Sequence, residues 1–272
     1  MHSVDFQISI ITVTLNNLEG LRRTLNSVLA QKNDLVEYVI IDGGSNDGTL
    51  SFLNTNSEKI NKYISEKDNG IYDAMNKGAL LSQGRYLLFL NSGDELCNCA
   101  INLYNSEINI SHYDFYYGQI YLKNGNESES KYEIKIPNYH QLGYGMSIFH
   151  PSTLISKTQF FKLGMYDCSF RLAADYNFFL KAYIKNASFK YINKPLAIYE
   201  SGGFSSQNAN LSLIENIKIK FQILPFYKSL PNILYSYIKF YGIIILRNFI
   251  FIILGSVLYK KTLNSIKNFK FF

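Results

Sequence analysis

The sequence predicts an α/β protein whose mostly parallel, Rossmann-like central sheet is flanked by helices. Two observations predict this class. Short β-branched runs alternate with segments of helical periodicity through residues 7–91. Each apolar run also ends in a polar segment, as strands do at the ligand-binding edge of a parallel sheet. The chain has 272 residues, of which 47% are hydrophobic, so it is long enough and apolar enough to fold around a substantial core.

The first half is predicted to alternate strand and helix in a regular order. The strands are expected over 7–14, 37–42, 61–65 and 85–91. The helices are expected after a cap at Asn16 or Asn17, from about Leu50, and over 70–82. In the last of these helices, Ala74, Gly78 and Ala79 form a face of small residues, which predicts close packing against the sheet.

The second half is predicted to be less regular. Residues 96–150 show no clear alternation, although Asn124–Gly125 indicates a hairpin turn. A strand and a short helix are expected over 147–164, a longer helix over 171–186, and an extended segment over 188–200. A Gly- and Ser-rich loop follows at 201–212.

The C-terminal part differs from the rest in charge. From Asn216 onward there are nine Lys or Arg residues and no acid, which leaves 18 of the 27 bases and all 21 acids in residues 1–215. An apolar stripe at helical spacing begins the tail, at Leu211, Ile214, Ile217, Phe221 and Leu224. Residues 211–272 are therefore predicted to be a helical, basic and aromatic extension that lies on a membrane surface.

Two other arrangements of the tail stay open. The run from Gly242 to Tyr259 has nearly the length of a spanning helix, but Arg247 interrupts it. A membrane-inserted segment and a soluble packing surface are the alternatives. A nucleic-acid partner is not expected, because the tail lacks a helix-turn-helix, RRM or zinc pattern and is too apolar for a phosphate-tracking arm.

The N-terminus and the cysteines predict the compartment. The first residues carry neither a basic segment nor a long apolar run, so a signal peptide is not expected. The three cysteines lack the spacing of a disulfide framework. We expect a cytoplasmic protein, associated through its tail with the inner face of the cytoplasmic membrane.

The predicted strand ends indicate the chemistry. They read "TLNN", "DGGSND", "SEKDNG" and "NSGDE", and three of them carry acids. The patterns of a dinucleotide fold and of a P-loop are absent. Carboxylates at such an edge can hold a divalent cation against a diphosphate and bind a base or ribose, and a separate acid can deprotonate a hydroxyl. These functions together describe transfer of a sugar from a nucleotide-sugar.

Five segments in order carry a family resemblance over residues 6–205. The segments are "ISIITVTLNN", "VIIDGGSNDGT", "SEKDNGIYDAMNKGALLSQGRYLLFLNSGDE", "IFHPSTLISKTQFFKLGMYD" and "RLAADYNFFLKAY". In these segments the chain resembles inverting family 2 glycosyltransferases of the GT-A fold, in particular the bacterial enzymes of colanic acid and O-antigen clusters.

The resemblance implies that different parts of the chain bind the donor, the acceptor and the membrane. Residues 1–95 would be the nucleotide-sugar-binding half, 96–210 the acceptor-binding half, and 211–272 the membrane-associated tail. The positions implied to bind the nucleotide-sugar are Thr14, Asn16, Asp42, Asp68, Lys77 and Asn91. Many relatives carry Arg where this chain has Met75, so a cationic contact is missing there. Asp47 is expected to be a helix cap rather than a ligand.

Asp94 occupies the place of the family's metal-binding acids. The resemblance implies that it binds Mg²⁺ or Mn²⁺, but relatives often have a further acid where this chain has Asn91. A turn with a solvated acid is the alternative for Asp94. Asp175 matches the catalytic base of the family, with an acid stabilised by a helix dipole as the alternative. His150 would lie near the donor sugar or the acceptor, and "SGGFS" (201–205) would close over the donor.

The function implied is that of a metal-dependent hexosyltransferase. It would move a sugar from a nucleotide-diphosphate donor, a UDP-sugar rather than a GDP-sugar, to a lipid-linked glycan in bacterial surface polysaccharide biosynthesis. Because the metal motif keeps only one of the acids that relatives often have, a non-catalytic nucleotide-sugar-binding or scaffolding homologue is the main alternative. A nucleotide-sugar hydrolase is a third.

Overall fold

The computed structural model describes residues 6–124, 131–200 and 208–225, together with Pro231, Leu234, Ile238 and Gly242. The chain divides into two compact units, Met1–Ile223 and Leu224–Phe272. All of the elements described below belong to the first unit.

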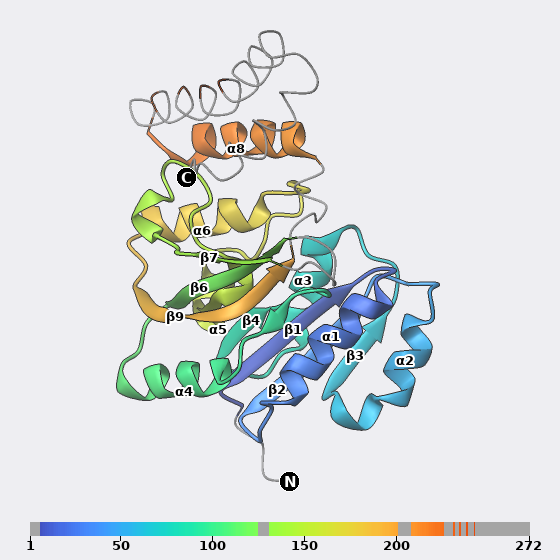
Figure 1. Cartoon of the computed structure of the whole chain (residues 1–272). Coiled ribbons are helices and arrows are strands. Elements are labelled where there is room, and N and C mark those ends of the chain that lie inside the picture. The colour runs from blue at the N-terminus through green and yellow to red at the C-terminus, as the bar shows by residue number, and fades with distance from the viewer. Residues whose placement is uncertain are drawn as a thin grey trace, which may run out of the picture. The chain divides into compact units, whose positions relative to one another are not determined.

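A single sheet runs through the first unit, with helices on both faces (Figure 1). Its strands are β1 (Ile8–Thr14), β2 (Val36–Asp42), β3 (Lys62–Ser65), β4 (Tyr86–Phe89), β5 (Glu95–Leu96), β6 (Phe115–Asn124), β7 (Lys131–Lys135), β8 (Thr153–Ser156) and β9 (Phe189–Glu200). The helices are α1 (Leu18–Leu29), α2 (Thr49–Thr55), α3 (Ile71–Leu81), α4 (Ala100–Ile110), α5 (Lys157–Lys162), α6 (Ala174–Ile184) and α8 (Ala209–Ile223), and short 3-10 turns occur at η1 (Ser57–Lys59), η3 (Tyr139–Gln141) and η4 (His150–Ser152).

The strand order is β3-β2-β1-β4-β8-β6-β9-β5, with β7 paired to β6. The strands β3, β2, β1 and β4 are parallel, as the alternation of the first half predicts. The second half joins at β8, which is antiparallel to both β4 and β6. The predicted α/β class with a central sheet flanked by helices is therefore confirmed, although the second half adds antiparallel pairings and makes the sheet mixed.

Burial explains why the first strands are so apolar. Every residue of β1 and β2 is buried, since helices cover both faces of the sheet. The α1 and α4 helices share one core cluster with Ile8 and Ile10 of β1. On the other face α3 packs closely, because a Cβ added to Gly78 would meet Ile11 Cγ2 at 2.4 Å. The predicted small-residue face of this helix is confirmed.

Capping and turn residues in the sequence predicted most helix ends correctly. Asn17, one of the two candidate caps, accepts a hydrogen bond from the Gly20 N–H at the start of α1. Asn16 instead adopts a left-handed conformation with φ of 49°. The α6 helix ends at Ile184, and Asn186 follows it in the left-handed region.

Two predictions about the second half were wrong. The segment expected to be irregular contains α4, whose Ile101, Tyr104 and Ile108 recur at helical spacing on the buried face. The helix expected over 171–186 begins only at Ala174. Residues 171–173 stay outside it because their N–H groups donate to the side chain of Glu215 on α8.

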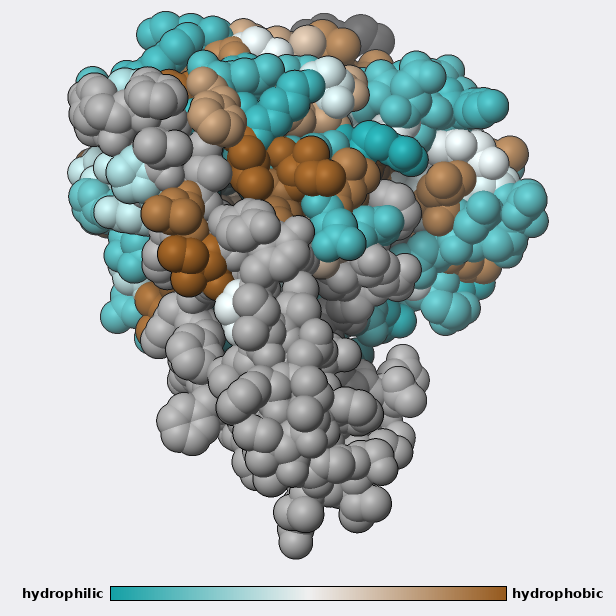
Figure 2. All heavy atoms as spheres, turned by 90° about the horizontal axis from the view of Figure 1, so that it is seen from above, coloured by the Kyte–Doolittle hydropathy of each residue, from teal (hydrophilic) through white to brown (hydrophobic). Residues whose placement is uncertain are grey.

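The start of the predicted tail forms α8, which packs against α6. Its buried residues are Glu215, Ile219 and Lys220, whereas Ile214 and Phe221 are 62% and 52% exposed. Figure 2 looks down on the end of the molecule where α8 lies in Figure 1, and apolar side chains are visible on this face among hydrophilic ones. The apolar stripe is thus only partly used for packing within the described part of the chain.

The remainder of the tail mostly falls outside the described residues. Apart from Gly242, the run from Gly242 to Tyr259 is among these undescribed positions, as are the "SGGFS" loop and the turn at Gly125. Within the described ranges, no helix is long and apolar enough to cross a membrane.

Candidate active site

The carboxyl ends of the parallel strands bring the predicted nucleotide-binding residues to one edge of the sheet. In the strand register, Thr14 of β1 lies opposite Asp42 of β2, and Asp42 lies opposite Ser65 of β3. The turn after β4 carries Asn91 and Asp94. These positions therefore share the edge at which α/β sheets bind their ligands.

Asp42 is fully buried and organises the loop that follows β2. Its carboxylate accepts hydrogen bonds from the Ser45 N–H at 3.2 Å and from the Ser65 hydroxyl at 2.6 Å. The Ser45 hydroxyl in turn accepts from the Asn16 N–H at 2.7 Å. Asp42 and Asn16 thus lie in one network that fixes the shape of this edge.

Asp68 lies against Gly43, the residue that follows Asp42. A Cβ at Gly43 would meet Asp68 Oδ2 at 2.5 Å, so a larger residue there would displace this carboxylate. Asp68 Oδ1 accepts from the Gly70 N–H at 2.9 Å. Thr14 is 5% exposed, and its hydroxyl has no hydrogen-bond partner among the described residues. An unpaired buried hydroxyl at a ligand edge is available to a bound molecule.

Two residues of α3, Lys77 and Met75, bear on whether the site has a cationic contact for the nucleotide-sugar. The Lys77 ammonium forms ion pairs with the carboxylates of Glu66 at 2.8 Å and Asp73 at 3.5 Å. Its charge is therefore paired with acids of α3 and of the loop before it. Met75 is 2% exposed and faces the core, so it cannot replace an arginine at the surface of the site.

Asp47 is a cap, as predicted. Its Oδ2 accepts from the Leu18 N–H at 2.9 Å, and its Oδ1 accepts from the Thr49 hydroxyl at 2.7 Å. The carboxylate therefore stabilises the starts of both α1 and α2. These hydrogen bonds, that of Thr49 first, hold the pKa of Asp47 below its ordinary value.

The turn after β4 is held from α1. Gly93 adopts a φ of 104°, which favours glycine. The Thr24 hydroxyl accepts from the Gly93 N–H at 3.0 Å and donates to the Asp94 carbonyl at 2.7 Å. Asn17 adds a hydrogen bond from its side-chain amide to the Ser92 carbonyl at 3.1 Å. The turn therefore presents Asp94 in a fixed conformation.

Asp94 is 5% exposed, and burial raises the pKa of its carboxyl to about 7. Nearby His150 and a backbone hydrogen bond from Glu200 favour the ionised form, but burial outweighs them. The Glu200 carboxylate acts in the same direction as burial, although Arg23 pairs with it at 2.7 Å.

Asp175 lies at the centre of a chain of contacts that reaches this turn. Its Oδ1 accepts from the Tyr72 hydroxyl at 2.9 Å, and its Oδ2 lies 3.5 Å from His150 Nδ1. His150 Nε2 lies 3.1 Å from Asn91 Nδ2. The predicted base, His150 and the metal-motif turn are thus brought together, although they come from α6, η4 and the end of β4.

Tyr72 is the member of this cluster that sequence reasoning missed. It stands in the first turn of α3 and is 7% exposed. Burial, together with the neighbouring Asp175 charge, holds the pKa of Tyr72 well above its ordinary value, so it acts as a hydroxyl donor. Nothing in the sequence separates it from the other members of a set of 22 tyrosines.

Two side chains of the turn offer oxygens that would suit a divalent cation if a bound diphosphate supplied the remaining ligands. Asn91 Oδ1 is buried without a hydrogen-bond partner among the described residues. With the Asp94 carboxyl it offers two oxygens, and Mg²⁺ is commonly held by one or two carboxylates together with substrate phosphates. Within the described ranges, no group of three or more His, Cys, Asp or Glu side chains could hold a metal ion by itself.

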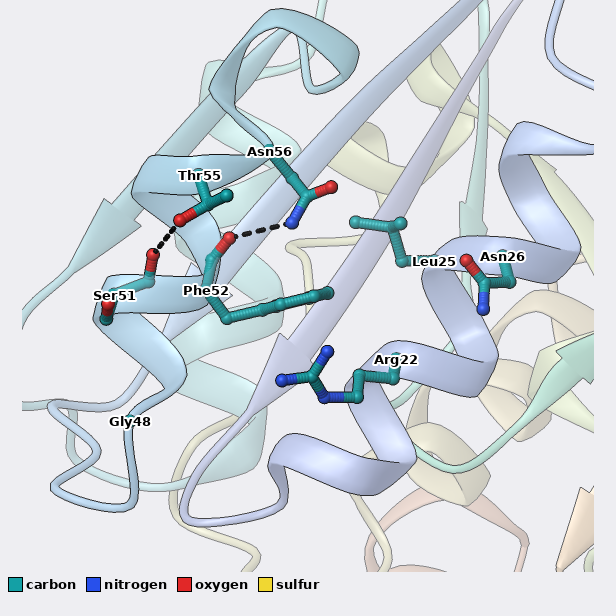
Figure 3. A pocket seen from close by; sticks show the side chains of 8 residues that line it. All are labelled: Arg22, Leu25, Asn26, Gly48, Ser51, Phe52, Thr55 and Asn56. Carbon is teal, nitrogen blue, oxygen red and sulfur yellow. Dashed lines mark hydrogen bonds between the residues drawn. The ribbon is translucent and has the colours of Figure 1, made fainter.

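Two surface hollows lie away from this cluster. One, of about 560 Å³, opens between α1 and α2, where Arg22 stands 4.5 Å from the centre of the Phe52 ring (Figure 3). The other, of about 720 Å³, is lined by Arg23 and Glu95, among others. None of the predicted site residues lines either hollow.

The match to known proteins agrees with this geometry. The model of the family "Glycosyl transferase family 2" matches residues 9–174, which include every predicted site residue except Asp175, the position that follows directly. The chain belongs to this family. It is therefore a glycosyltransferase, as the resemblance implied.

Relatives of the chain come from several bacteria. An uncharacterized glycosyltransferase of Mycobacterium tuberculosis is 30% identical over 181 residues, which cover 64% of this chain and 68% of the relative. A PGL/p-HBAD biosynthesis glycosyltransferase of Mycobacterium bovis is 29% identical over 208 residues, covering 73% and 78%. Staphylococcus aureus TarS, solved with UDP-GlcNAc, matches with a TM-score of 0.69 at 18% identity, over 86% of this chain and 73% of TarS. This last likeness confirms the GT-A fold.

Proposed function

We propose that this glycosyltransferase moves a sugar from a UDP-sugar to a glycan acceptor with inversion, using Asp175 as the base. The observation that carries the proposal is the chain of contacts from Asp175 through His150 to Asn91, beside Asp94. It sets a candidate base facing the turn where a diphosphate would be held. TarS, which shares the fold, was solved with UDP-GlcNAc and with UDP, and this supports a UDP-sugar donor.

The nucleotide would lie along the sheet edge. Asp42 and Asp68 would accept hydrogen bonds from the base and ribose, and the Thr14 hydroxyl and Asn16 would line the same edge. Lys77 would approach the diphosphate only by leaving Glu66, since the two are now paired at 2.8 Å.

In the proposed step, the acceptor hydroxyl gives its proton to Asp175 while its oxygen attacks the anomeric carbon. The bond from that carbon to the diphosphate oxygen breaks, UDP leaves with the electron pair, and the configuration inverts. The Tyr72 hydroxyl donates to Oδ1, which leaves Oδ2, on the side of His150, to receive the proton.

Tyr72 has one hydroxyl hydrogen but two neighbours at 2.9 Å, Asp175 Oδ1 and the Leu172 carbonyl. It donates to Asp175 while that carboxylate is ionised. Once Asp175 holds the proton, Tyr72 can donate to Leu172 instead. The arrangement therefore supports both charge states of the base.

Asp94 and the Asn91 carbonyl oxygen would hold Mg²⁺ or Mn²⁺. When bound, such a cation neutralises charge on the leaving diphosphate. His150 orients the Asn91 amide, so that the turn, the histidine and the base keep a fixed relation.

We further propose that the acceptor is lipid-linked and that residues 211–272 hold the protein at the inner face of the cytoplasmic membrane. The basic, aromatic composition of this segment supports it, as do the exposed Ile214 and Phe221 side chains. Relatives named for PGL/p-HBAD biosynthesis and for teichuronic acid biosynthesis support a role in glycan biosynthesis. Truncation after Ser229 should move the protein from the membrane to the soluble fraction, and unchanged partitioning would contradict this part.

A non-catalytic nucleotide-sugar-binding homologue is the second candidate function, favoured by the single acid of the metal motif. UDP release from a panel of nucleotide-sugars separates the two. A transferase releases UDP faster when acceptor and Mg²⁺ or Mn²⁺ are present, whereas a scaffold binds the donor without turnover and a hydrolase needs no acceptor.

The role of Asp175 is tested by replacing it with Asn. Asp175→Asn should abolish transfer and leave donor binding intact, with the exposed Asp34→Asn as the matched control. Near-normal turnover of Asp175→Asn would show that Asp175 is not the base.

A further inference from the structure

A buried carboxylate on α8 binds the segment that leads to the candidate base. Glu215 is 7% exposed and lies beyond residues 9–174, the part of the chain that the family model matches. Its Oε1 accepts from the Arg171 N–H at 2.8 Å, and its Oε2 accepts from the N–H groups of Leu172 and Ala173 at 2.9 and 3.0 Å. Three consecutive backbone groups thus converge on one side chain.

The same segment is held from its other side by α3. The Leu172 carbonyl accepts from the Tyr72 hydroxyl at 2.9 Å, and that hydroxyl also contacts Asp175 Oδ1 at 2.9 Å. Glu215 therefore fixes the N–H side of residues 171–173, and Tyr72 fixes the carbonyl side. Asp175 follows within the first turn of α6.

A second buried charge on α8 reaches the other segment of the site. Lys220 is 1% exposed, and its Nζ donates to the Tyr144 carbonyl at 2.8 Å. Tyr144 lies on the segment that leads to His150. The two buried charges of this helix thus contact the two segments that carry His150 and Asp175.

A carboxylate is an unusual choice for simple packing, because burying a charge is costly unless hydrogen bonds satisfy it. Charge-assisted hydrogen bonds are short and directional, so three of them fix the orientation of successive peptide groups. A negative charge before the first turn of α6 also interacts favourably with the helix dipole. The Glu215 carboxylate is therefore suited to fixing the orientation of the backbone that precedes Asp175.

We propose that Glu215 is a positioning residue for the glycosyltransferase reaction. It fixes residues 171–173 so that the Asp175 carboxylate faces His150 and the acceptor. The inference rests on the proposed function, in which Asp175 is the base. It also means that the catalytic unit is incomplete without α8.

The test compares Glu215→Gln and Glu215→Asp with the wild-type full-length chain. Gln offers one acceptor oxygen and turns an NH₂ donor toward the backbone donors, whereas Asp keeps the charge but is one methylene shorter. Turnover is measured as UDP release from the UDP-sugar that wild type uses, per UDP-binding site. Glu58→Gln, an exposed site on η1, is the matched control.

We expect kcat of Glu215→Gln to fall about 10- to 100-fold, as for a base misplaced by about 1 Å. The KM for donor and the Kd for UDP should change less than about two-fold, because the nucleotide edge is built on β1 to β3. Glu215→Asp should retain more activity than Glu215→Gln. A purely structural residue would lower the melting temperature and the number of UDP-binding sites, but not kcat per site.

Amide hydrogen exchange provides a readout independent of turnover. The amides of Arg171, Leu172 and Ala173 should be protected in wild type and lose protection in Glu215→Gln. Loss of protection with kcat per site unchanged would overturn the positioning role alone. Absence of turnover by wild type with every nucleotide-sugar would overturn the proposed function, and the positioning role with it. If Glu215→Gln does not fold, the kcat of Glu215→Asp decides, and a value equal to wild type overturns the role.

Discussion

Replacing Asp94 with Asn should stabilise the protein at neutral and alkaline pH. The Asp94 carboxyl is 5% exposed, and burial raises its pKa from 3.8 to about 7. The folded state therefore binds this proton more tightly than the unfolded state. Stability from this group is fully present below about pH 4 and is lost as pH rises through about 7, where the buried group must ionise. Asn is neutral at every pH and has nearly the same shape.

The size of the effect follows from the pKa shift. A shift of about three pH units corresponds to about 4 kcal/mol between pH 4 and pH 8. Because a domain of this size gains roughly 2–4 °C in Tm per kcal/mol, Asp94→Asn should melt up to roughly 8–16 °C higher than wild type at pH 8. At pH 4 the two proteins should melt together.

The assay is thermal unfolding by circular dichroism from pH 4 to pH 8. EDTA is included because a cation bound at Asp94 would favour the ionised form. The exposed Asp34→Asn change is the matched control and should follow wild type at every pH. If Asp94→Asn and wild type lose the same stability between pH 4 and pH 8, the assignment of a raised pKa to Asp94 is wrong.

Three further changes test the fold and the site. Gly78→Leu should cost about 1–3 kcal/mol in urea unfolding, because its Cβ would overlap β1, while Gly145→Ala, in open space, should be nearly neutral. Tyr72→Phe should lower kcat with donor KM unchanged, since it removes the hydroxyl that donates to Asp175, the proposed base. Tyr132→Phe, at an exposed position, should change neither, and equal kcat values would exclude a role for the Tyr72 hydroxyl. Asp47→Ala should cost about 1–2 kcal/mol of unfolding free energy through loss of two caps, and an unchanged urea midpoint would contradict the capping contacts.

The α/β class, the parallel strands and most helix ends were predictable from sequence, because each depends on neighbours within a few residues. Alternation of strand and helix fixes a parallel sheet, and a parallel sheet gathers its polar strand ends at one edge. Asn17 and Asp47 act as caps through N–H groups two or three positions along the chain, whereas the bond of Asp47 to the Leu18 N–H, 29 positions away, depends on the fold. The strand ends indicated that acids such as Asp42, Asp68 and Asp94 gather at this edge, and the family resemblance implied the role of each.

The contacts among Tyr72, Asp175, His150 and Asn91 were decided by tertiary structure. Tyr72 and Asp175 are 103 positions apart, and Asn91 and His150 are 59 apart. Glu215 reaches residues 171–173 from α8, which delays the start of α6 in a way that helical periodicity does not reveal. Sequence patterns report which residues share a face or an edge of one element. Which side chains then meet depends on how separate elements pack around the sheet, and only the folded chain brings those partners within hydrogen-bonding distance.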